Sequence, residues 1–324
     1  MERIGILLAT GVAILWGSAD VCATLGARRL GTMTTTFISL LVSVITLTLF
    51  GAIAFRQLAL TSQMLALSIP LGLLTGLMAA LGYATFYRGL ELGPIAIVSP
   101  LAAADGAIAA VLAILLLHES VSAWQVGTLL VIFFGIILAS TNLEELLRLL
   151  RPSGDRPLAR GGIRWGIIAA LAFGVMLFGI GAASQRWGWF LPIFWTRFFG
   201  ALALAGVIGW RSYRSRNSQI SGSAGSRKGI DVSFFRLGAG QRNAVERISI
   251  LPLGVGLFET AGLVMYSVGT QIAATSIVAT ISSTFTLIPI LFGITFLRER
   301  PAVNQLVGVC MVIAGLLLLG IKPV

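Results

Sequence analysis

Ten apolar stretches, each about as long as a bilayer is thick, constrain this chain more than any other feature. A hydrocarbon core about 30 Å thick needs about 20 mostly apolar helical residues per crossing. Only 11% of the residues are charged and 57% are hydrophobic, with a mean hydropathy of +0.95, whereas soluble domains are roughly one quarter charged. The sequence therefore predicts an all-α integral membrane protein with ten transmembrane helices. The predicted spans are Ile4–Leu25, Met33–Phe55, Leu65–Tyr87, Pro94–Leu117, Ala123–Thr141, Ile163–Ser184, Trp189–Trp210, Ile248–Val268, Ala274–Leu297 and Ala302–Gly320.

The second half of the chain repeats the plan of the first at an offset of 180 residues. At this offset Glu119 aligns with Glu299 and Gln125 with Gln305, where one apolar stretch ends and the next begins. Matches of Gly, Ile and Leu are common by chance in membrane helices, whereas charged residues are rare there. The Glu pair therefore indicates an internal repeat.

The two predicted repeats occupy residues 4–141 and 163–320, and a basic linker at 142–162 separates them. Their first spans align less clearly, at an offset nearer 162, which pairs Gly17 with Gly179. Each repeat holds five spans, and an odd number inserts the second repeat upside down relative to the first. Inverted repeats are typical of secondary transporters, whose substrate sites lie near the bilayer midplane where the halves meet.

Several short motifs resemble one known family. They are Trp16–Ser18 in the first span, Gly89–Pro94 between spans three and four, and Glu119 and Glu299 at the ends of spans four and nine. With ten spans in two repeats, the chain resembles the EamA branch of the drug/metabolite transporter superfamily, although Ala273–Ala274 replaces the Gly-Pro turn in the second repeat. The resemblance implies a multi-pass protein of the cell (inner) membrane that exports or imports a small metabolite.

Basic residues predict the orientation. Of the 23 Lys and Arg residues, eighteen lie on the side opposite the termini and four on the terminal side. Because basic loops stay in the cytoplasm, we expect both termini outside. The net charge of +11 lies in loops beside the spans, where it meets anionic lipid headgroups, so no nucleic-acid partner is expected. A Ser-, Gly- and Arg-rich insert at 211–247 is typical of a solvated linker.

Four ionisable residues fall within the spans: Asp20, Asp105, Arg197 and Glu259. Each costs about 3 kcal/mol at the centre of a helix, so each needs a partner, a proton or water. For Arg197 and Glu259 a buried ion pair and a substrate role are both open. Asp20 lies near the end of its span, where a side chain reaches the interface. Asp105 has small neighbours and is the first candidate to exchange protons.

Aromatic residues deep in the spans are further candidates. Trp16, Tyr83, Tyr87, Trp195 and Tyr266 are suited to line a cavity for apolar or cationic groups, with ordinary helix packing as the alternative. We interpret Glu119 and Glu299 as structural, because their position at helix ends gives no desolvation to make them reactive.

Other function classes lack their residues. An enzyme needs clustered nucleophiles, bases or metal ligands, and the single histidine is His118; Cys22 and Cys310 have no nearby partner in sequence for a disulfide or metal site. No phosphate-binding GxxxxGK[ST] loop and no repeated filter-like loop appear. We therefore expect no enzyme and no cofactor, but a proton-coupled secondary carrier for an amino-acid-like or other small organic solute. The alternative is an efflux carrier for hydrophobic cations or drugs.

Overall fold

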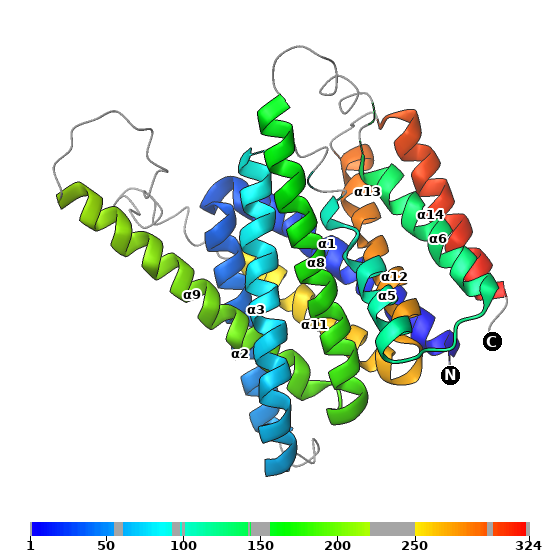
Figure 1. Ribbon diagram of the computed structural model, residues 1–324, viewed down its shortest axis with the longest axis horizontal. Coiled ribbons are helices and arrows are strands. Elements are labelled where there is room, and N and C mark those ends of the chain that lie inside the picture. The colour runs from blue at the N-terminus through cyan, green and yellow to red at the C-terminus, as the bar shows by residue number, and fades with distance from the viewer. Residues whose placement is uncertain are drawn as a thin grey trace.

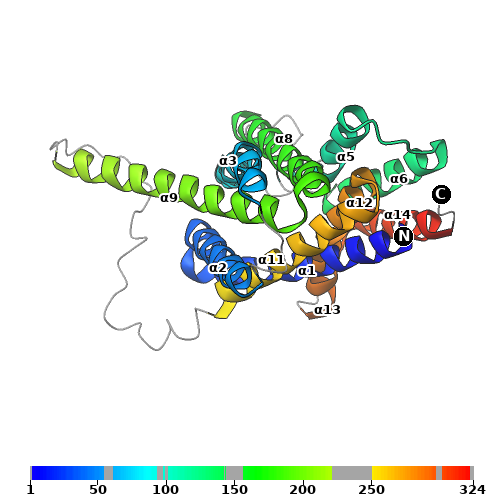
Figure 2. The same cartoon turned by 90° about the horizontal axis from the view of Figure 1, so that it is seen from below.

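The computed structural model of the chain describes residues 2–54, 61–92, 98, 101–141, 143, 156–220, 250–296 and 301–321. Every regular element in these residues is a helix (Figure 1). The elements are α1 (Glu2–Leu30), α2 (Thr32–Ile53), α3 (Ser62–Leu92), α5 (Asp105–Leu116), α6 (Ala123–Ser140), α8 (Arg156–Trp187), α9 (Phe190–Ile220), α11 (Ile250–Ile272), α12 (Thr275–Ser282), the 3-10 helix η2 (Ser283–Thr286), α13 (Leu287–Phe296) and α14 (Val303–Ile321). Both termini lie at the same end of the molecule in Figures 1 and 2.

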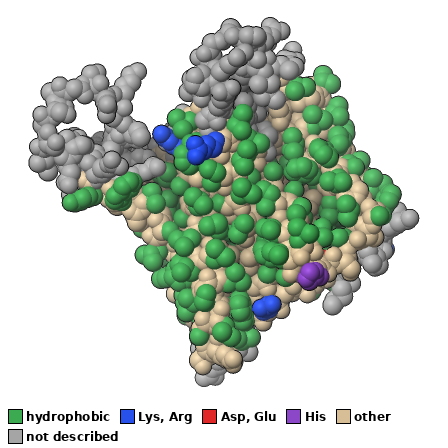
Figure 3. Space-filling model, viewed as in Figure 1, with side chains coloured by type: hydrophobic (Ala, Val, Ile, Leu, Met, Phe, Trp, Pro, Cys, Tyr) green, Lys and Arg blue, Asp and Glu red, His purple; other side chains and the backbone are tan. Residues whose placement is uncertain are grey.

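The helices agree with a membrane protein. In the part of the chain that the structure describes, eight spans are long and apolar enough to cross a bilayer, and the shorter apolar helices α5 and α14 lie at the spans predicted at Pro94–Leu117 and Ala302–Gly320. Hydrophobic side chains cover most of the face drawn in Figure 3, and among the described residues that face shows no acidic side chain. A surface of this kind suits contact with lipid rather than water.

Two helices extend into the segments predicted as polar insert and basic linker. The seventh span was expected to end at Trp210, but α9 continues to Ile220, into the polar insert. Residues 211–220 contain neither Gly nor Pro, so the apolar stretch ends there while nothing terminates the helix. Likewise α8 begins at Arg156, inside the predicted linker. The rest of the insert, 221–247, lies outside the described residues, as do the predicted turn at Gly93–Pro94 and Glu299.

The ninth predicted span is broken in the middle, where α12 passes through η2 into α13. Ser283 and Thr284 donate their hydroxyl hydrogens to the carbonyls of Ala279 and Ile281 at 3.1 and 2.7 Å. Such bonds compete with the regular helical ladder. Pro289 follows and has no N–H to donate, so the ladder is also incomplete on the far side of η2.

The repeated glutamines begin helices in the same way in both halves. Gln125 accepts the backbone N–H of Ser122 at 2.8 Å, and the Ser122 hydroxyl accepts that of Gln125, which together form a capping box. Gln305 accepts the N–H of Ala302 at 3.0 Å, and both of these residues lie 180 positions after their counterparts. The repeat in sequence is thus a repeat in hydrogen bonding.

Glycine contacts correct the alignment of the first spans. The backbone of Gly17 in α1 lies directly against Ile288, and that of Gly174 in α8 lies against Ile108, which is 180 residues before Ile288. Gly17 and Gly174 are therefore equivalent, at an offset of 157. The offset of 162, which pairs Gly17 with Gly179, is wrong, because Gly179 instead packs on Thr75 of α3.

A second set of contacts gives the same offset. Gly82 packs on Phe173 and its counterpart Gly262 packs on Trp16, again 157 residues earlier. The second spans follow this rule too, since the two Gly residues 180 apart in α3 and α11 meet α9 and α2 at matching positions. These contacts are Gly76 with the Thr196 carbonyl and Phe199, and Gly256 with the Ser39 carbonyl and Val42.

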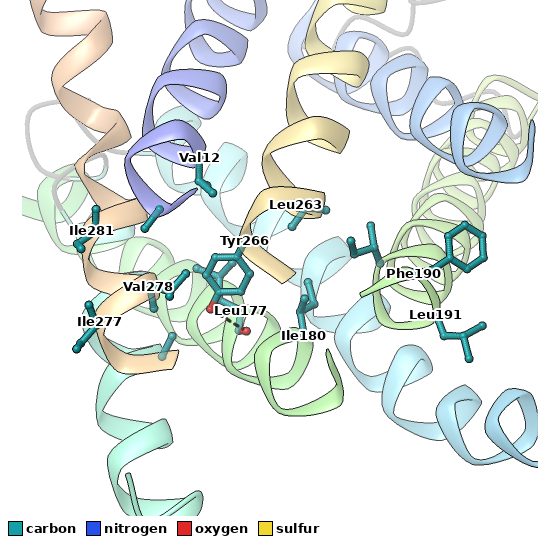
Figure 4. Packing of buried hydrophobic residues seen from close by; sticks show 14 of the residues in the cluster. Val12, Leu177, Ile180, Phe190, Leu191, Leu263, Tyr266, Ile277, Val278 and Ile281 are labelled. Carbon is teal, nitrogen blue, oxygen red and sulfur yellow. Dashed lines mark hydrogen bonds between the residues drawn. The ribbon is translucent and has the colours of Figure 1, made fainter. Parts of the chain in front are cut away.

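The packing of whole helices shows the same correspondence between the two repeats. The helix α3 packs on α8 and α9, as its counterpart α11 packs on α1 and α2. Equivalent helices also meet each other, in the pairs α2 with α9 and α6 with α14. The largest buried cluster lies mainly among α1, α8, α9, α11 and α12 (Figure 4), where fully buried Tyr266 donates its hydroxyl hydrogen to the Leu177 carbonyl at 3.1 Å.

Candidate functional site

An ion pair lies inside the membrane-spanning region. Arg197 of α9 approaches Glu259 of α11, with 2.9 Å between Nη2 and Oε2. The Arg197 side chain is 7% exposed and that of Glu259 is 18% exposed. Each charge alone would cost about 3 kcal/mol at the centre of a span. The attraction between the two charges therefore offsets part of the free energy that burying each of them costs.

Two tyrosines extend this pair into the first repeat. Tyr83 of α3 donates its hydroxyl hydrogen to Glu259 Oε1 at 3.3 Å. Its ring stacks on that of Tyr87, with 6.3 Å between ring centroids, and the Tyr87 hydroxyl bonds the Thr36 hydroxyl of α2 at 2.6 Å. We call Arg197, Glu259, Tyr83 and Tyr87 the polar cluster. It joins α3 of the first repeat to α9 and α11 of the second.

Asp20 of α1 lies about where its sequence position indicates, a short distance inside the end of its span. The helix continues to Leu30, so Asp20 is six residues, about 9 Å, inside the end of the apolar span Arg3–Gly26. Its charge interacts with those of Glu259 and Asp105. Within the described part of the chain Asp20 makes no hydrogen bond or ion pair, and it remains partly exposed. It is a carboxylate beside the polar cluster.

Asp105 occupies a different position, in the first turn of α5. Its Oδ1 accepts the backbone N–H of Gly106 at 2.6 Å and the hydroxyl of Ser283 at 3.3 Å. The residue is 8% exposed. Ser283 belongs to η2 of the second repeat, so this bond joins the two halves at the break in the ninth span. In the described residues no bond links Asp105 to Arg197 or Glu259. The sequence signal for Ser283 was the hydroxyl run of residues 282–284, which is unusual inside an apolar span.

The other aromatic candidates serve helix packing. Trp16 stacks on Tyr266 with 5.9 Å between ring centroids and meets the edge of Phe285 at 6.0 Å. Trp195 donates its indole N–H to the Ser68 hydroxyl at 3.1 Å. The polar atoms of Trp195 and Tyr266 are thus used between helices, which separates these residues from the polar cluster.

Glu119 makes a contact that sequence reasoning missed. Its two carboxylate oxygens accept the backbone N–H groups of Thr275 and Ser276, at 2.7 and 3.0 Å. These groups begin α12, whose N-cap residue Ala274 has no capping side chain. A carboxylate satisfies such free donors and interacts favourably with the helix dipole. A residue of the first repeat therefore caps a helix of the second. The only hint of this contact in the sequence was that the Ala-Ala-Thr-Ser start of the helix has no capping side chain of its own.

Gln185 strengthens the same contact. Its side-chain amide donates to the Thr270 carbonyl at 3.2 Å and to the Thr275 hydroxyl at 3.1 Å. Together with Glu119 it ties α8, α11 and α12 at the end of the molecule where the termini lie (Figure 1). We call Glu119, Gln185, Thr270, Thr275 and Ser276 the terminal-side contact.

Across the described ranges, no group of three or more His, Cys, Asp or Glu side chains lies close enough to hold a metal ion. Cys22 and Cys310 are free thiols. The ionisable groups described above are therefore the chemistry that this part of the chain offers.

Comparisons with known proteins agree with this architecture. Residues 3–141 and 160–321 match the model of the EamA-like transporter family. A solved structure titled "Crystal structure of protein" resembles this one with a TM-score of 0.65 at 13% sequence identity, over 98% of this chain and 96% of that chain. This likeness concerns the fold. No curated protein matches the sequence.

Proposed function

Because the chain belongs to the EamA-like transporter family, and so is a membrane transporter of the drug/metabolite superfamily, we propose that it is a secondary active transporter. Its substrate is a small organic solute, such as an amino-acid-like metabolite, which crosses the cell (inner) membrane by alternating access. The family match in each half and the exchangeable helix pairs support ten spans in two inverted five-helix repeats.

The observation that carries this proposal is the polar cluster. Arg197 and Glu259 come from the second repeat and Tyr83 from the first, so a rocking motion of one repeat against the other alters their contacts. Buried charges in transporters mark the pathway of the substrate or the coupling ion. Trp16, Trp195 and Tyr266 support the packing around this site.

Proton coupling needs a carboxylate that exchanges protons between the two access states. Asp105, Glu259 and Asp20 are the candidates. Glu259 and Asp20 are partly exposed and lie together, whereas Asp105 is buried and held by two donors. The accessible carboxylates are therefore the better carriers of a proton that must enter and leave.

One observation favours the alternative function, efflux of hydrophobic cations. Arg197 is neutralised by Glu259, and Asp20 has no ion-pair partner among the described residues. The ring faces of Tyr83 and Tyr87 lie nearby, and such faces attract cations. A carrier of this class would accumulate lipophilic ammonium compounds rather than anionic or zwitterionic metabolites.

Orientation follows from the charge distribution. The eighteen-to-four split of basic residues supports both termini outside the cytoplasm. Reporter fusions at Val324 and within residues 215–229 should give opposite signals, with the internal fusion cytoplasmic. A cytoplasmic C-terminus would reverse the orientation and leave the fold unchanged.

Transport itself is tested with the purified chain in liposomes. A thermal-shift screen first finds solutes that stabilise the protein, since ligands raise apparent stability by mass action. Counterflow of a hit is then measured for the wild type and for the double variant Arg197→Gln/Glu259→Gln. A well-folded double variant without counterflow assigns the pair to transport. A fully active one makes the pair purely structural and removes the main support for this site.

A further inference from the structure

Arg197 has a donor that the rest of the site does not use. A guanidinium carries five N–H donors and no acceptor. Its Nη2 meets Glu259, but its buried Nε has no hydrogen-bond partner among the residues that the structure describes. A buried donor without an acceptor is rare in a native fold and calls for a physical reason. A ligand that supplies the missing acceptor is such a reason.

The shape of the guanidinium identifies the ligand chemistry. Nε and an adjacent Nη form a planar edge whose two N–H groups match the two oxygens of a carboxylate. We infer that the Nε edge of Arg197 receives the carboxylate of a transported monoanion, and that Glu259 takes up one proton as the monoanion binds. This inference rests on the proposed function, because it names the substrate class and the coupling group of the same site.

Charge balance links the two events. The Arg197–Glu259 pair is neutral, so a second carboxylate at Arg197 would leave one uncompensated negative charge in a medium that solvates charge poorly. A proton from water that binds Glu259 Oε2, as this oxygen leaves Arg197, restores neutrality. One proton balances one negative charge, so a monoanion fits and a dianion does not.

The surroundings of Glu259 allow this exchange. Its side chain is 18% exposed, against 7% for Arg197, so the carboxylate is the more accessible of the two groups. The charged and titratable groups that face it are Arg197 from α9, Tyr83 and Tyr87 from α3, and Asp20 from α1. Tyr83 bonds Oε1 and leaves Oε2 to alternate between Arg197 and a proton.

The test compares acids with their uncharged amides on the purified full-length protein. Acetate, benzoate and indole-3-acetate are titrated against acetamide, benzamide and indole-3-acetamide by calorimetry between pH 6 and 8, in two buffers of different ionisation enthalpy. At least one acid should bind more tightly than its amide. Its affinity should rise about tenfold for each unit that pH falls, with about one proton taken up per acid bound. If no acid exceeds its amide, the inference is overturned.

Three variants assign the proton and the anion. Glu259→Gln copies the protonated form and should bind the acid without proton uptake and without pH dependence. Arg197→Lys keeps the charge but lacks the two parallel N–H donors of the guanidinium. The ratio of acid affinity to amide affinity should therefore fall roughly tenfold or more. Asp20→Asn, the matched carboxylate control, should keep the proton uptake. Unchanged proton uptake in Glu259→Gln, or its loss in Asp20→Asn, contradicts the assignment.

Counterflow separates this inference from the proposed function. A chain that exchanges solutes in liposomes but binds acids without a proton on Glu259 remains a carrier, and only the inference fails. A chain that binds acids with one proton but exchanges no solute keeps the site, and the proposed function fails.

Discussion

The two repeats of this protein pack alike but differ in chemistry at equivalent positions. With offsets of 157 for the first two spans and 180 for the others, the glycine contacts and helix pairs of one half recur in the other. The ionisable groups inside the spans do not recur. Arg197 corresponds to Leu40, Glu259 to Ala79, Asp20 to Leu177 and Asp105 to Phe285.

This difference separates the scaffold from the site. Contacts that both halves share permit two related arrangements, because exchanging the roles of the repeats turns one arrangement into the other. Charged groups that only one half supplies give one polar cluster per molecule. In the proposed mechanism the symmetric residues serve the motion, and the asymmetric residues serve the solute. This division between scaffold and site is tested by variants that give a position the residue of the other repeat, and by variants that change two equivalent positions in the same way.

The largest effect is expected when Arg197 is replaced by the residue of the other repeat. Arg197→Leu leaves Glu259 buried without its partner, and breaking a buried pair in this way costs about 3–5 kcal/mol. Thermal unfolding in detergent should show a strongly lowered midpoint, and counterflow should be lost.

Its control is the double variant Arg197→Leu/Glu259→Ala, which gives both positions the residues of the first repeat. Most of the lost stability should return, because no unpaired charge remains, but transport should not. A double variant that transports normally would mean that the asymmetric pair has no part in the function.

The lengths of the apolar stretches and the spacing of a few charged residues were enough to predict the helices, the membrane and the repeat, because these patterns depend little on tertiary contacts. The family resemblance drawn from short motifs is confirmed by the match over both halves. The alignment of the first spans was wrong because Gly is common in apolar helices. Only the neighbour of each glycine, such as Ile288 beside Gly17, distinguishes the true counterpart.

Side-chain partners were harder to predict than side-chain depth. A sequence shows that Glu119 lies where a span ends, but not that Thr275, 156 residues later, supplies the donor. In the same way Asp105 was recognised as buried, whereas its bond to Ser283 depends on how α5 meets the break between α12 and α13. Such contacts are set by the packing of the two halves, which single-sequence patterns do not encode.

The next effect tests the shared scaffold at two equivalent glycines. Gly17→Ala and Gly174→Ala each add a methyl group against an isoleucine of the other repeat. Overpacking of this kind costs about 1–3 kcal/mol, and the two losses should be similar. Gly127→Ala is the control, because nothing lies within 4 Å of the added group. Its thermal unfolding midpoint should equal that of the wild type or be slightly higher. Very unequal losses of stability at the two sites would argue against aligning the first spans at an offset of 157.

A smaller effect distinguishes the terminal-side contact from an ordinary helix cap. Glu119→Gln keeps one acceptor oxygen but loses the charge and the second bond to α12, at an expected cost of about 1–2 kcal/mol. Ser122→Ala removes a cap within one repeat, at about 1 kcal/mol. Labelling of a cysteine introduced at the terminal side should increase in Glu119→Gln alone, since of these two side chains only Glu119 bonds the other repeat. Equal accessibility in both variants would make Glu119 a local cap.

The smallest effect is expected for Asp105→Asn, the change that tests the first candidate for proton exchange. The amide oxygen of Asn can still accept the N–H of Gly106 and the hydroxyl of Ser283, so the stability loss should stay below about 1.5 kcal/mol. If Glu259 carries the proton, uptake driven by a pH gradient should keep its dependence on pH in this variant, whereas Glu259→Gln measured in parallel should lose it. A different result would move the coupling site. Should Asp105→Asn abolish proton-driven accumulation and leave counterflow intact, the proton belongs to the contact between α5 and η2, where Asp105 of the first repeat accepts the Ser283 hydroxyl of the second.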